Sequence, residues 1–428
     1  MKITAIKARE VLDSRGNPTV GAIVTLDNGA VGQALVPSGA STGTYEAVEL
    51  RDKNEKRYQG TGVLSAVKNI EEIIAPALVG LDPEDQVEID RLMIELDGTD
   101  NKAKLGANAI LAVSLAVARA TAASLGQPLY QYLTRFNPDF SGQYLMPLPM
   151  MNVLNGGKHA DWATDIQEYM ILPVGANSMA QAVRMNAEIY QSLKKILKNK
   201  GYGLAVGDEG GFAPAVSSNE EPFELLVAAV SAAGYRLGVD IVFGIDAAAT
   251  EFYSEGRYEL KKEGKILDSV ALASFYALLQ SKYPILSWED IFSEDDWQGF
   301  QNFMLKFGSS SQLVGDDLYV TNINRLEKGI ADKASNSILI KLNQIGTLSE
   351  TIAAILLARQ NGLSSVISHR SGETEDTFIA DLAVAMGTGQ IKAGAPARSE
   401  RTAKYNRLME IEQELEGNSR FASFPFSS

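Results

Sequence analysis

The sequence contains no cysteine and only two histidines, His159 and His369. The lack of cysteine excludes disulfide bonds, thiolate metal sites and cysteine nucleophiles, and it agrees with a reducing compartment. Any metal ion must therefore be held by oxygen ligands or by histidine. No apolar run approaches the length of a membrane span, and the segment after Met1 begins a strand pattern instead of a signal-peptide core. We therefore expect a cytoplasmic protein.

Basic residues are also fewer than acidic ones, since the chain has 39 Lys and Arg but 53 Asp and Glu, which gives a net charge of −14. This charge disfavours nucleic acid and anionic membranes as partners, and we expect neither. An anionic small-molecule substrate would need local cations or metal ions to enter. The 428 residues, of which 45% are hydrophobic, are enough for two or three domains with a large core.

The first part of the chain carries short strand patterns followed by helical patterns. The strand patterns cover residues 3–8, 19–26 and 30–35. The helical patterns cover residues 62–78, 84–96 and 106–133, the last of them alanine-rich and ending near Gly126-Gln127-Pro128. Strands followed by helices predict an α+β domain, which we bound at residues 1–136.

The pattern of apolar and polar residues changes after a turn-rich stretch at residues 136–142. We therefore place the domain boundary there and assign residues 143–428 to a second domain. From about residue 146, short apolar runs alternate with amphipathic helical segments. This alternation is typical of a βα array with a parallel sheet.

Polar side chains stand where these apolar runs end. They are Glu168, Glu209, Asp246, Glu289, Asp316, Lys341, His369 and Lys392. From Glu289 onward the separations are 27, 25, 28 and 23 residues, near the length of one strand, loop and helix. One polar group at the end of each strand predicts an α/β barrel with a site at its C-terminal face.

Three of these side chains are carboxylates that suit a hard cation. Asp246, Glu289 and Asp316 offer only oxygen ligands, which favours Mg²⁺ over zinc. One strand-end acid alone is more often a helix cap or an ion-pair partner. Three in register would repel one another without a cation, so together they indicate a metal site.

Lys341 is a candidate base because it follows the apolar residues Ile338, Leu339 and Ile340. Burial of a cation costs several kcal/mol unless it is paired or loses its proton, so we expect its pKa to be lowered. The alternative is a lysine that snorkels from the strand end or pairs with one acid, and this stretch alone leaves both open. Thr347-Leu348-Ser349-Glu350 has the pattern of a capping box, which places Lys341 on a strand-to-helix loop.

Residues 37–44 form a loop of small residues whose hydroxyls and amides could close over a phosphate or bind a hard cation. The alternative for this loop is an ordinary flexible turn.

Several longer motifs together resemble the enolase family over nearly the whole chain. They are Asp13-Ser14-Arg15-Gly16-Asn17-Pro18-Thr19, Ser38-Gly39-Ala40-Ser41-Thr42, Gly207-Asp208-Glu209-Gly210-Gly211-Phe212, Lys341-Leu342-Asn343-Gln344-Ile345-Gly346-Thr347, Ser368-His369-Arg370-Ser371-Gly372-Glu373 and Arg398-Ser399-Glu400-Arg401. The resemblance implies a modified (β/α)8 barrel, similar to a TIM barrel but with an altered strand order, under the N-terminal α+β cap. It also implies reversible dehydration of 2-phosphoglycerate to phosphoenolpyruvate.

The resemblance further assigns roles to single residues. Lys341 would remove the carbon-2 proton, and Glu209 would assist departure of the carbon-3 hydroxyl. Two Mg²⁺ ions would bind, the first to Asp246, Glu289 and Asp316 and the second, arriving with substrate, to Ser41. Lys392 and the metals would keep Lys341 partly neutral. Glu168, His159 and Lys392 would also be catalytic residues. The substrate contacts would come from His159, Gln167, Glu168, His369, Lys392 and, for the phosphate, Arg370 and Ser371.

Some positions depart from the family pattern. Trp162-Ala163-Thr164 replaces the usual asparagines, and Trp288 and Ile291 flank Glu289-Asp290. The family also implies a homodimer, alone or within a larger ring such as an octamer, in which Arg9 would pair with Glu400 of the other chain. A second family pair is absent, because its two positions hold Gly21 and Glu410.

Two other functions stay open at this stage. One is a different enolase-superfamily reaction through an enolate, against which Arg370-Ser371 and the Ser41 loop argue because they imply a phosphate. The other is a binding or scaffold role, including one at the cell surface.

Overall fold

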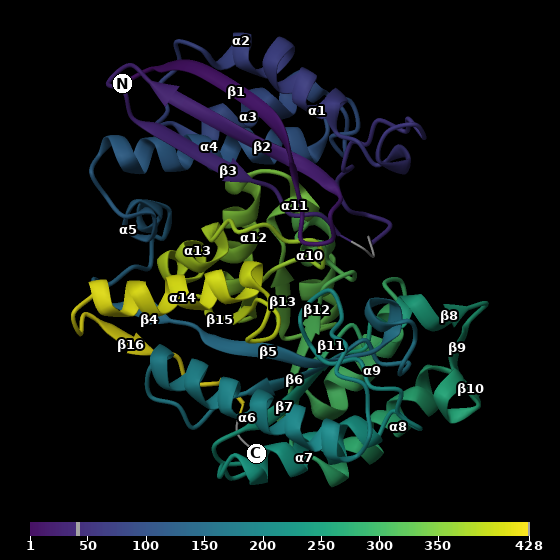
Figure 1. Ribbon diagram of the computed structural model, residues 1–428. Helices are drawn as coiled ribbons and strands as arrows, with labels where there is room; N and C mark the ends of the chain where they lie inside the picture. Colours follow the sequence, from purple (N-terminus) through teal and green to yellow (C-terminus); the bar gives the residue numbers. More distant parts are fainter. Residues whose placement is uncertain (40–42, 427–428) are drawn as a thin grey trace.

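The computed structural model describes residues 1–39 and 43–426. It contains an N-terminal cap and a closed barrel (Figure 1). The cap begins with an antiparallel sheet, β1 (Ile3–Leu12), β2 (Pro18–Leu26) and β3 (Val31–Leu35). Alternation of apolar and polar residues buries one face of this sheet beneath helices, as the strand patterns predicted.

The cap helices follow the sheet in the chain. They are α1 (Leu64–Asn69), the π-helical turn η2 (Ile70–Ile74), α2 (Ala75–Leu78), α3 (Gln86–Asp97), α4 (Ala107–Ser124) and α5 (Leu129–Leu133). The predicted helix over 106–133 is therefore two helices, because Gly126 has a φ of +64° and Pro128 precedes α5. The predicted α+β order of the cap is confirmed.

Helix α4 packs directly on strands β2 and β3. A Cβ at Gly32 would lie 2.2 Å from the carbonyl oxygen of Ala116, so only glycine allows this close approach. By length and composition α4 is also apolar enough to cross a membrane, which contradicts the expectation that no run approaches that length. Because 83% of it is buried inside the structure, its apolar character is explained by its place in the cap core.

The barrel has eight strands around a closed ring. In ring order they are β5 (Leu148–Asn155), β6 (Glu168–Leu172), β7 (Val242–Asp246), β11 (Ile285–Glu289), β12 (Gln312–Gly315), β13 (Ser337–Ile340), β14 (Ser364–Ser368) and β15 (Gly389–Lys392). Strand β6 runs antiparallel to both of its neighbours, and the other pairs are parallel. The expectation of a modified α/β barrel under an α+β cap is confirmed.

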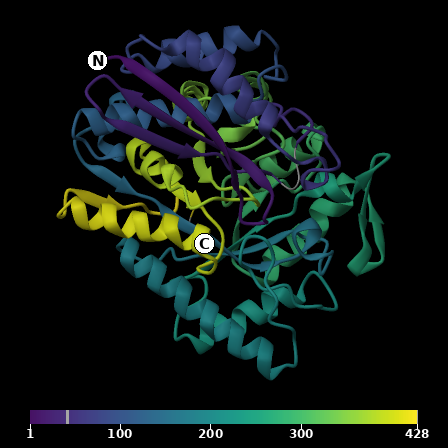
Figure 2. The same ribbon diagram turned by 45° about the horizontal axis from the view of Figure 1, so that its top comes forward.

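Helices surround the barrel. They are α6 (Met179–Asn199), α7 (Glu221–Ala232), α8 (Ser269–Lys282), α9 (Trp297–Phe307), α10 (Ile323–Asp332), α11 (Leu342–Ile345), α12 (Leu348–Gln360), α13 (Phe378–Met386) and α14 (Ser399–Glu414). In Figure 2, α14 lies alongside α6, while the small sheet β8 (Tyr253–Ser254), β9 (Arg257–Leu260) and β10 (Lys265–Leu267) projects from the barrel. Strand β4 (Tyr144–Met146) pairs in parallel with β16 (Ser419–Phe421) outside the ring.

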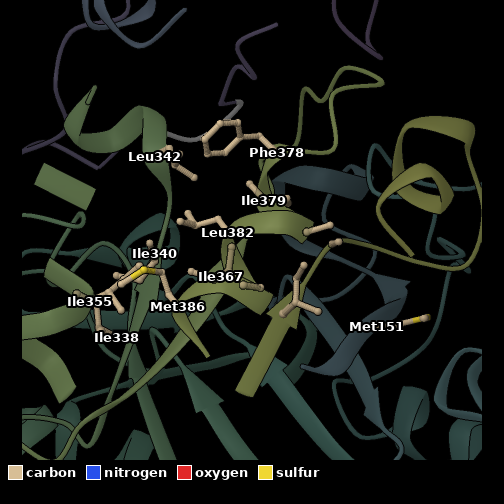
Figure 3. Packing of buried hydrophobic residues seen from close by; sticks show 14 of the residues in the cluster. Met151, Ile338, Ile340, Leu342, Ile355, Ile367, Phe378, Ile379, Leu382 and Met386 are labelled. Atoms are coloured by element: carbon tan, nitrogen blue, oxygen red, sulfur yellow. The ribbon is translucent and has the colours of Figure 1, made fainter. Parts of the chain in front are cut away.

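Strand β13 shows how the barrel positions its polar ends. Ile338 and Ile340 point outward and pack with Ile355, Leu382 and Met386 of α12 and α13 (Figure 3). Leu339 belongs instead to the apolar cluster inside the barrel. Since successive strand residues alternate in direction, the next inward position after Leu339 is Lys341.

Candidate active site

Six of the eight polar residues predicted at strand ends do lie there. Asp246, Glu289 and Lys392 are the last residues of their strands, and Asp316, Lys341 and His369 directly follow theirs. Lys341 precedes α11, and Thr347 caps α12 by accepting a hydrogen bond from the Glu350 amide, as predicted. All but Glu289 line one polar cavity at the barrel mouth, together with Gln167, Glu168, Glu209, Arg370 and Ser371.

Glu168 was expected at a strand end but is the first residue of β6. Because β6 is antiparallel to β7, the start of β6 lies beside the end of β7, and Glu168 is paired in register with Asp246. The prediction was wrong about the strand direction. The reversed strand nevertheless brings Glu168 to the same mouth.

Glu209 also departs from the expected position, because in the described chain it follows no strand. It lies in a tight turn closed by the Gly207 amide, which donates to the Gly211 carbonyl at 2.8 Å. Phe212 pairs with Leu154 of β5 by an isolated bridge, which anchors the turn against the barrel. A Cβ at Gly211 would lie 2.4 Å from Asn155 Oδ1, so the turn requires glycine there.

The ammonium group of Lys392 lies among three buried carboxylates. Its Nζ is 2.8 Å from Glu289 Oε1, 3.0 Å from Glu168 Oε2 and 3.2 Å from Asp246 Oδ2. Burial opposes the charge on Lys392, but these carboxylates outweigh it and raise the pKa of Lys392 well above its ordinary value. Burial and the neighbouring charges of Glu209 and Asp246 raise the pKa of Glu168 despite Lys392.

Lys341 forms an ion pair with Asp316. Burial and the like charges of Arg370 and Lys392 lower the pKa of Lys341, but the Asp316 carboxylate outweighs them and the net pKa is raised. The expected lowering is therefore wrong for this arrangement, and the alternative of pairing with one acid is the one observed. The carboxylate of Asp316 also accepts a hydrogen bond from Gln344 Nε2 at 2.8 Å.

The acids at the mouth fit a cation. Burial and the charge of Asp246 raise the pKa of Glu289 well above the ordinary range, although Lys392 opposes this. Glu289 Oε2 is buried and has no hydrogen-bond partner among the described residues, which leaves an oxygen ligand available. Asp246, Glu289 and Asp316 therefore offer the oxygen donors that a hard divalent cation prefers, although among the described residues their ligand atoms are not gathered within 4.8 Å of one another.

A second grouping of acids brings together Asp290, Asp316 and Asp317, whose ligand atoms lie within 4.8 Å of one another. The two carboxylate oxygens of Asp290, however, accept hydrogen bonds from the amides of Asp316 and Asp317 at 2.8 and 2.7 Å. Asp290 itself has a φ of +42°. We therefore assign Asp290 to holding the loop after β12, and leave Asp316 as the member shared with the other acids.

Arg370 joins the barrel to the cap. Its guanidinium donates to Glu46 Oε2 at 2.8 Å and to Asn343 Oδ1 at 3.0 Å. Glu46 also accepts from the Gly43 amide at 3.0 Å and from Gln344 Nε2 at 3.3 Å. The segment after the small-residue loop is thus tied to the barrel mouth.

His369 is buried and lies between Arg401 and Glu209. Its Nδ1 is 2.5 Å from Arg401 Nη1, and its Nε2 is 3.6 Å from Glu209 Oε1. Glu209 Oε2 accepts a hydrogen bond from Asn152 Nδ2 at 2.9 Å. Burial lowers the pKa of His369 well below its ordinary value and Arg401 adds to this, so the imidazole is neutral.

Two comparisons with known families agree with this arrangement. A family model described as "Enolase, N-terminal domain" matches residues 3–133, and one described as "Enolase, C-terminal TIM barrel domain" matches residues 143–427. The chain belongs to the enolase family. The acids and lysines at the barrel mouth are therefore those of an enolase-superfamily enzyme.

Two residues that the enolase resemblance assigned to the site cannot be placed. Ser41 lies outside the described residues. His159 belongs to the short helix η4 (Gly157–Ala160), and the described part of the chain does not include its side chain.

The departures from the enolase pattern have clear positions. Trp288 faces away from Glu289 and is buried against Tyr276 and Phe303, so it leaves the mouth unchanged. Asp161 and Trp162 both have positive φ, and the Trp162 amide donates to the Gly157 carbonyl at 2.8 Å. The indole is partly exposed and lies 5.9 Å from Lys261 Nζ.

Several site residues were missed by reasoning from the sequence. Gln344 and Arg401 lie inside the motifs that carried the resemblance, and Asp290 directly follows the predicted ligand Glu289, so these stretches were the available signal. No sequence signal pointed to Asn152 or Glu46, since each meets its partner only through the tertiary fold.

Proposed function

We propose that the chain catalyses the reversible dehydration of 2-phosphoglycerate to phosphoenolpyruvate with two Mg²⁺ ions. The observation that carries the proposal is the mouth cavity, which is lined by a lysine, a set of acids and the adjacent Arg370 and Ser371. A carbon acid beside a carboxylate is very weak, so its ionisation needs both a placed base and strong stabilisation of negative charge.

Asp246, Glu289 and Asp316 would hold one Mg²⁺ ion, and Ser41 would be a ligand of the second. When bound, these ions supply the positive charge that stabilises the second negative charge on the substrate carboxylate. Burial and, after it, the charge of Asp246 raise the pKa of Glu289, and a bound cation would offset both effects.

Lys341 is the proposed base that takes the carbon-2 proton. A base must be neutral before it accepts a proton, and the positive charges of Arg370 and Lys392 favour the neutral amine, whereas Asp316 opposes it. Loss of the Asp316 contact would therefore be the event that releases Lys341 for its role.

Glu209 is the proposed acid that assists departure of the carbon-3 hydroxyl. Its carboxyl would give a proton to the leaving hydroxide to form water, and Asn152 already donates to its Oε2. Burial and the charge of the Glu209 carboxylate raise the pKa of Glu168, so Glu168 would be the protonated member of the two once Glu209 has given up its proton.

Arg370 and Ser371 are the proposed phosphate ligands. The Arg370 guanidinium pairs with the Glu46 carboxylate, and the same fork of N–H donors can bind a phosphate, which supports this role. Gln167, His369, His159 and Lys392 would complete the substrate contacts. An enolase-superfamily reaction on a substrate without phosphate would give Arg370 and Ser371 no role in substrate binding, so it is the second candidate.

We also propose a homodimer, alone or within a larger ring, paired through Arg9 and Glu400. Arg9 is exposed on β1, opposite Gly21 in register. Glu410 is satisfied within its own chain by Arg407, at 2.7 Å, so it needs no partner across an interface. A cytoplasmic location stays a prediction.

The direct test is to add 2-phosphoglycerate and Mg²⁺ and follow the ultraviolet absorbance of the enol phosphate. We expect product formation by the wild type and none by Lys341→Ala. Glycerate, which lacks the phosphate, is the matched control and should not react. Turnover of glycerate with no turnover of 2-phosphoglycerate would contradict the proposal and favour the second candidate.

A further inference from the structure

Arg401 on the first turn of α14 is fully buried behind the mouth, and its side chain has no exposed surface. Its guanidinium donates to three backbone carbonyls: Arg370 and Ser371, each at 2.6 Å, and Asp208 at 3.0 Å. Its Nη1 also contacts His369 Nδ1 at 2.5 Å. One side chain thus joins the loop after β14 to the turn that carries Glu209.

The contact with His369 has a chemical consequence. A guanidinium has N–H donors and no acceptor, so the nitrogen that it contacts must offer a lone pair. His369 Nδ1 is therefore unprotonated, and the single proton of the neutral ring resides on Nε2. That nitrogen is the one 3.6 Å from Glu209 Oε1.

The other arrangement of the proton would be unfavourable at both ends of the ring. A proton on Nδ1 would face an Arg401 donor, and the Nε2 lone pair would face the Glu209 carboxylate. The charged groups around His369 are Glu209, Arg401, Lys392 and Lys341, and three of these four are cations that oppose an imidazolium.

We propose that Arg401 is a positioning residue that fixes His369 as the Nε2–H tautomer and thereby aims an N–H donor at Glu209. The functional consequence rests on the proposed dehydration. When the Glu209 carboxyl gives its proton to the leaving hydroxide, the remaining carboxylate keeps its hydrogen bond from Asn152 Nδ2 at 2.9 Å. It also faces the His369 Nε2–H at 3.6 Å, which is longer than a hydrogen bond but still places the positive end of an N–H dipole toward the new charge.

A purely structural role for Arg401 makes a different prediction. Its bonds to the three carbonyls would hold the loops whatever the state of the imidazole, and the tautomer would then not depend on Arg401. The proton position in His369 after replacement of Arg401 separates the two accounts, and it can be measured without any turnover.

The first experiment is a two-bond ¹H–¹⁵N correlation spectrum of the full chain labelled with ¹⁵N-histidine. Because the chain has only two histidines, the variant His159→Asn leaves His369 as the single imidazole. We expect an unprotonated Nδ1 and a protonated Nε2, unchanged across the pH range in which the protein is folded. An Nδ1–H tautomer, or an imidazolium at neutral pH, would overturn the proposal.

The second experiment compares Arg401→Gln with Arg401→Lys. The glutamine amide can accept as well as donate, so His369 should populate both tautomers and begin to titrate, while lysine, which only donates, should keep the Nε2–H form. If the tautomer in Arg401→Gln is the same as in the wild type, Arg401 does not set it. Should Arg401→Gln fail to give a folded spectrum, a wild-type spectrum with the proton on Nδ1, or with an imidazolium at neutral pH, would still overturn the proposal.

The kinetic expectation follows the spectroscopic one. Arg401→Gln should slow dehydration by about 10- to 100-fold, the range for groups that orient a reacting residue, and Arg401→Lys should recover part of the loss. Absence of all activity in the wild type would refute the proposed function and leave the tautomer result standing.

Discussion

The barrel can be divided into a regular arc, β11 to β15, and an irregular arc, β5 to β7, and both supply residues to the same site. From β11 to β15 every strand is parallel, and the residues at the strand ends are those that the spacing predicted, Glu289, Asp316, Lys341, His369 and Lys392. From β5 to β7 the middle strand is reversed, and both α6 and α7 separate β6 from β7.

The irregular arc nevertheless contributes acids to the mouth. Glu168 arrives at the start of its strand instead of at the end, and Glu209 arrives on a glycine turn held by Asn152 and by the bridge of Phe212 to β5. A regular spacing therefore locates site residues only where each strand is followed by one helix and another parallel strand. Elsewhere, tertiary contacts decide which residues meet.

The largest expected effect is loss of activity on removal of divalent metal. The proposed ligands Asp246, Glu289 and Asp316 come from β7, β11 and the residue after β12. Exhaustive chelation should reduce turnover of 2-phosphoglycerate to background, and Mg²⁺ should restore it. Turnover that survives chelation would contradict the two-metal proposal.

A large effect on stability is expected for Lys392→Met, which removes the cation shared by the two arcs. Glu168 from β6 and Glu289 from β11 would then face each other as buried acids without an ammonium group. We expect a loss of about 3–5 kcal/mol in the free energy of unfolding, measured with urea in the absence of divalent metal.

The matched control for Lys392 is Lys158→Met, which removes the exposed ion pair of Lys158 with Glu251 and should cost at most about 1 kcal/mol. Equal losses for the two variants would show that Lys392 does not hold the acids together.

A smaller effect is expected for Gly211→Ala, which tests the turn of the irregular arc. The new methyl group would meet Asn155 Oδ1 at 2.4 Å and the Val153 carbonyl carbon at 3.0 Å. We expect a loss of about 1–3 kcal/mol in unfolding free energy and a lower dehydration rate, because the turn must shift Glu209.

Gly203→Ala is the control for this variant, since its Cβ would meet nothing within 4 Å and its backbone is not strained. If both glycine variants lose the same unfolding free energy and the same dehydration rate, close packing at Gly211 does not fix the turn.

How far the sequence could predict the structure follows from the same two arcs. Strand alternation and spacing were enough to place Lys341 and Lys392 at a barrel mouth, because these signals are local. The reversed direction of β6 left no local signal, since the apolar run after Glu168 fits either direction. The raised pKa of Lys341 depends on Asp316, whose contact no spacing reveals. The pairing of Arg370 with Glu46 joins two domains.

The smallest expected effect lies outside both arcs. Arg9→Ala should weaken the proposed dimer by about 0.2–1 kcal/mol, as for an exposed ion pair, and leave turnover per chain unchanged. Light scattering across a dilution series measures the first quantity. A wild-type monomer at micromolar concentration, or a variant dimer as tight as the wild type, would contradict the proposed pairing.

The central claim is that a base from the regular arc and an acid from the irregular arc act at different steps. The most direct test compares exchange of the carbon-2 proton with solvent and dehydration in Lys341→Ala and Glu209→Gln. The account predicts that Lys341→Ala abolishes both exchange and dehydration, while Glu209→Gln slows dehydration and retains measurable exchange. Equal loss of both activities in both variants would contradict it.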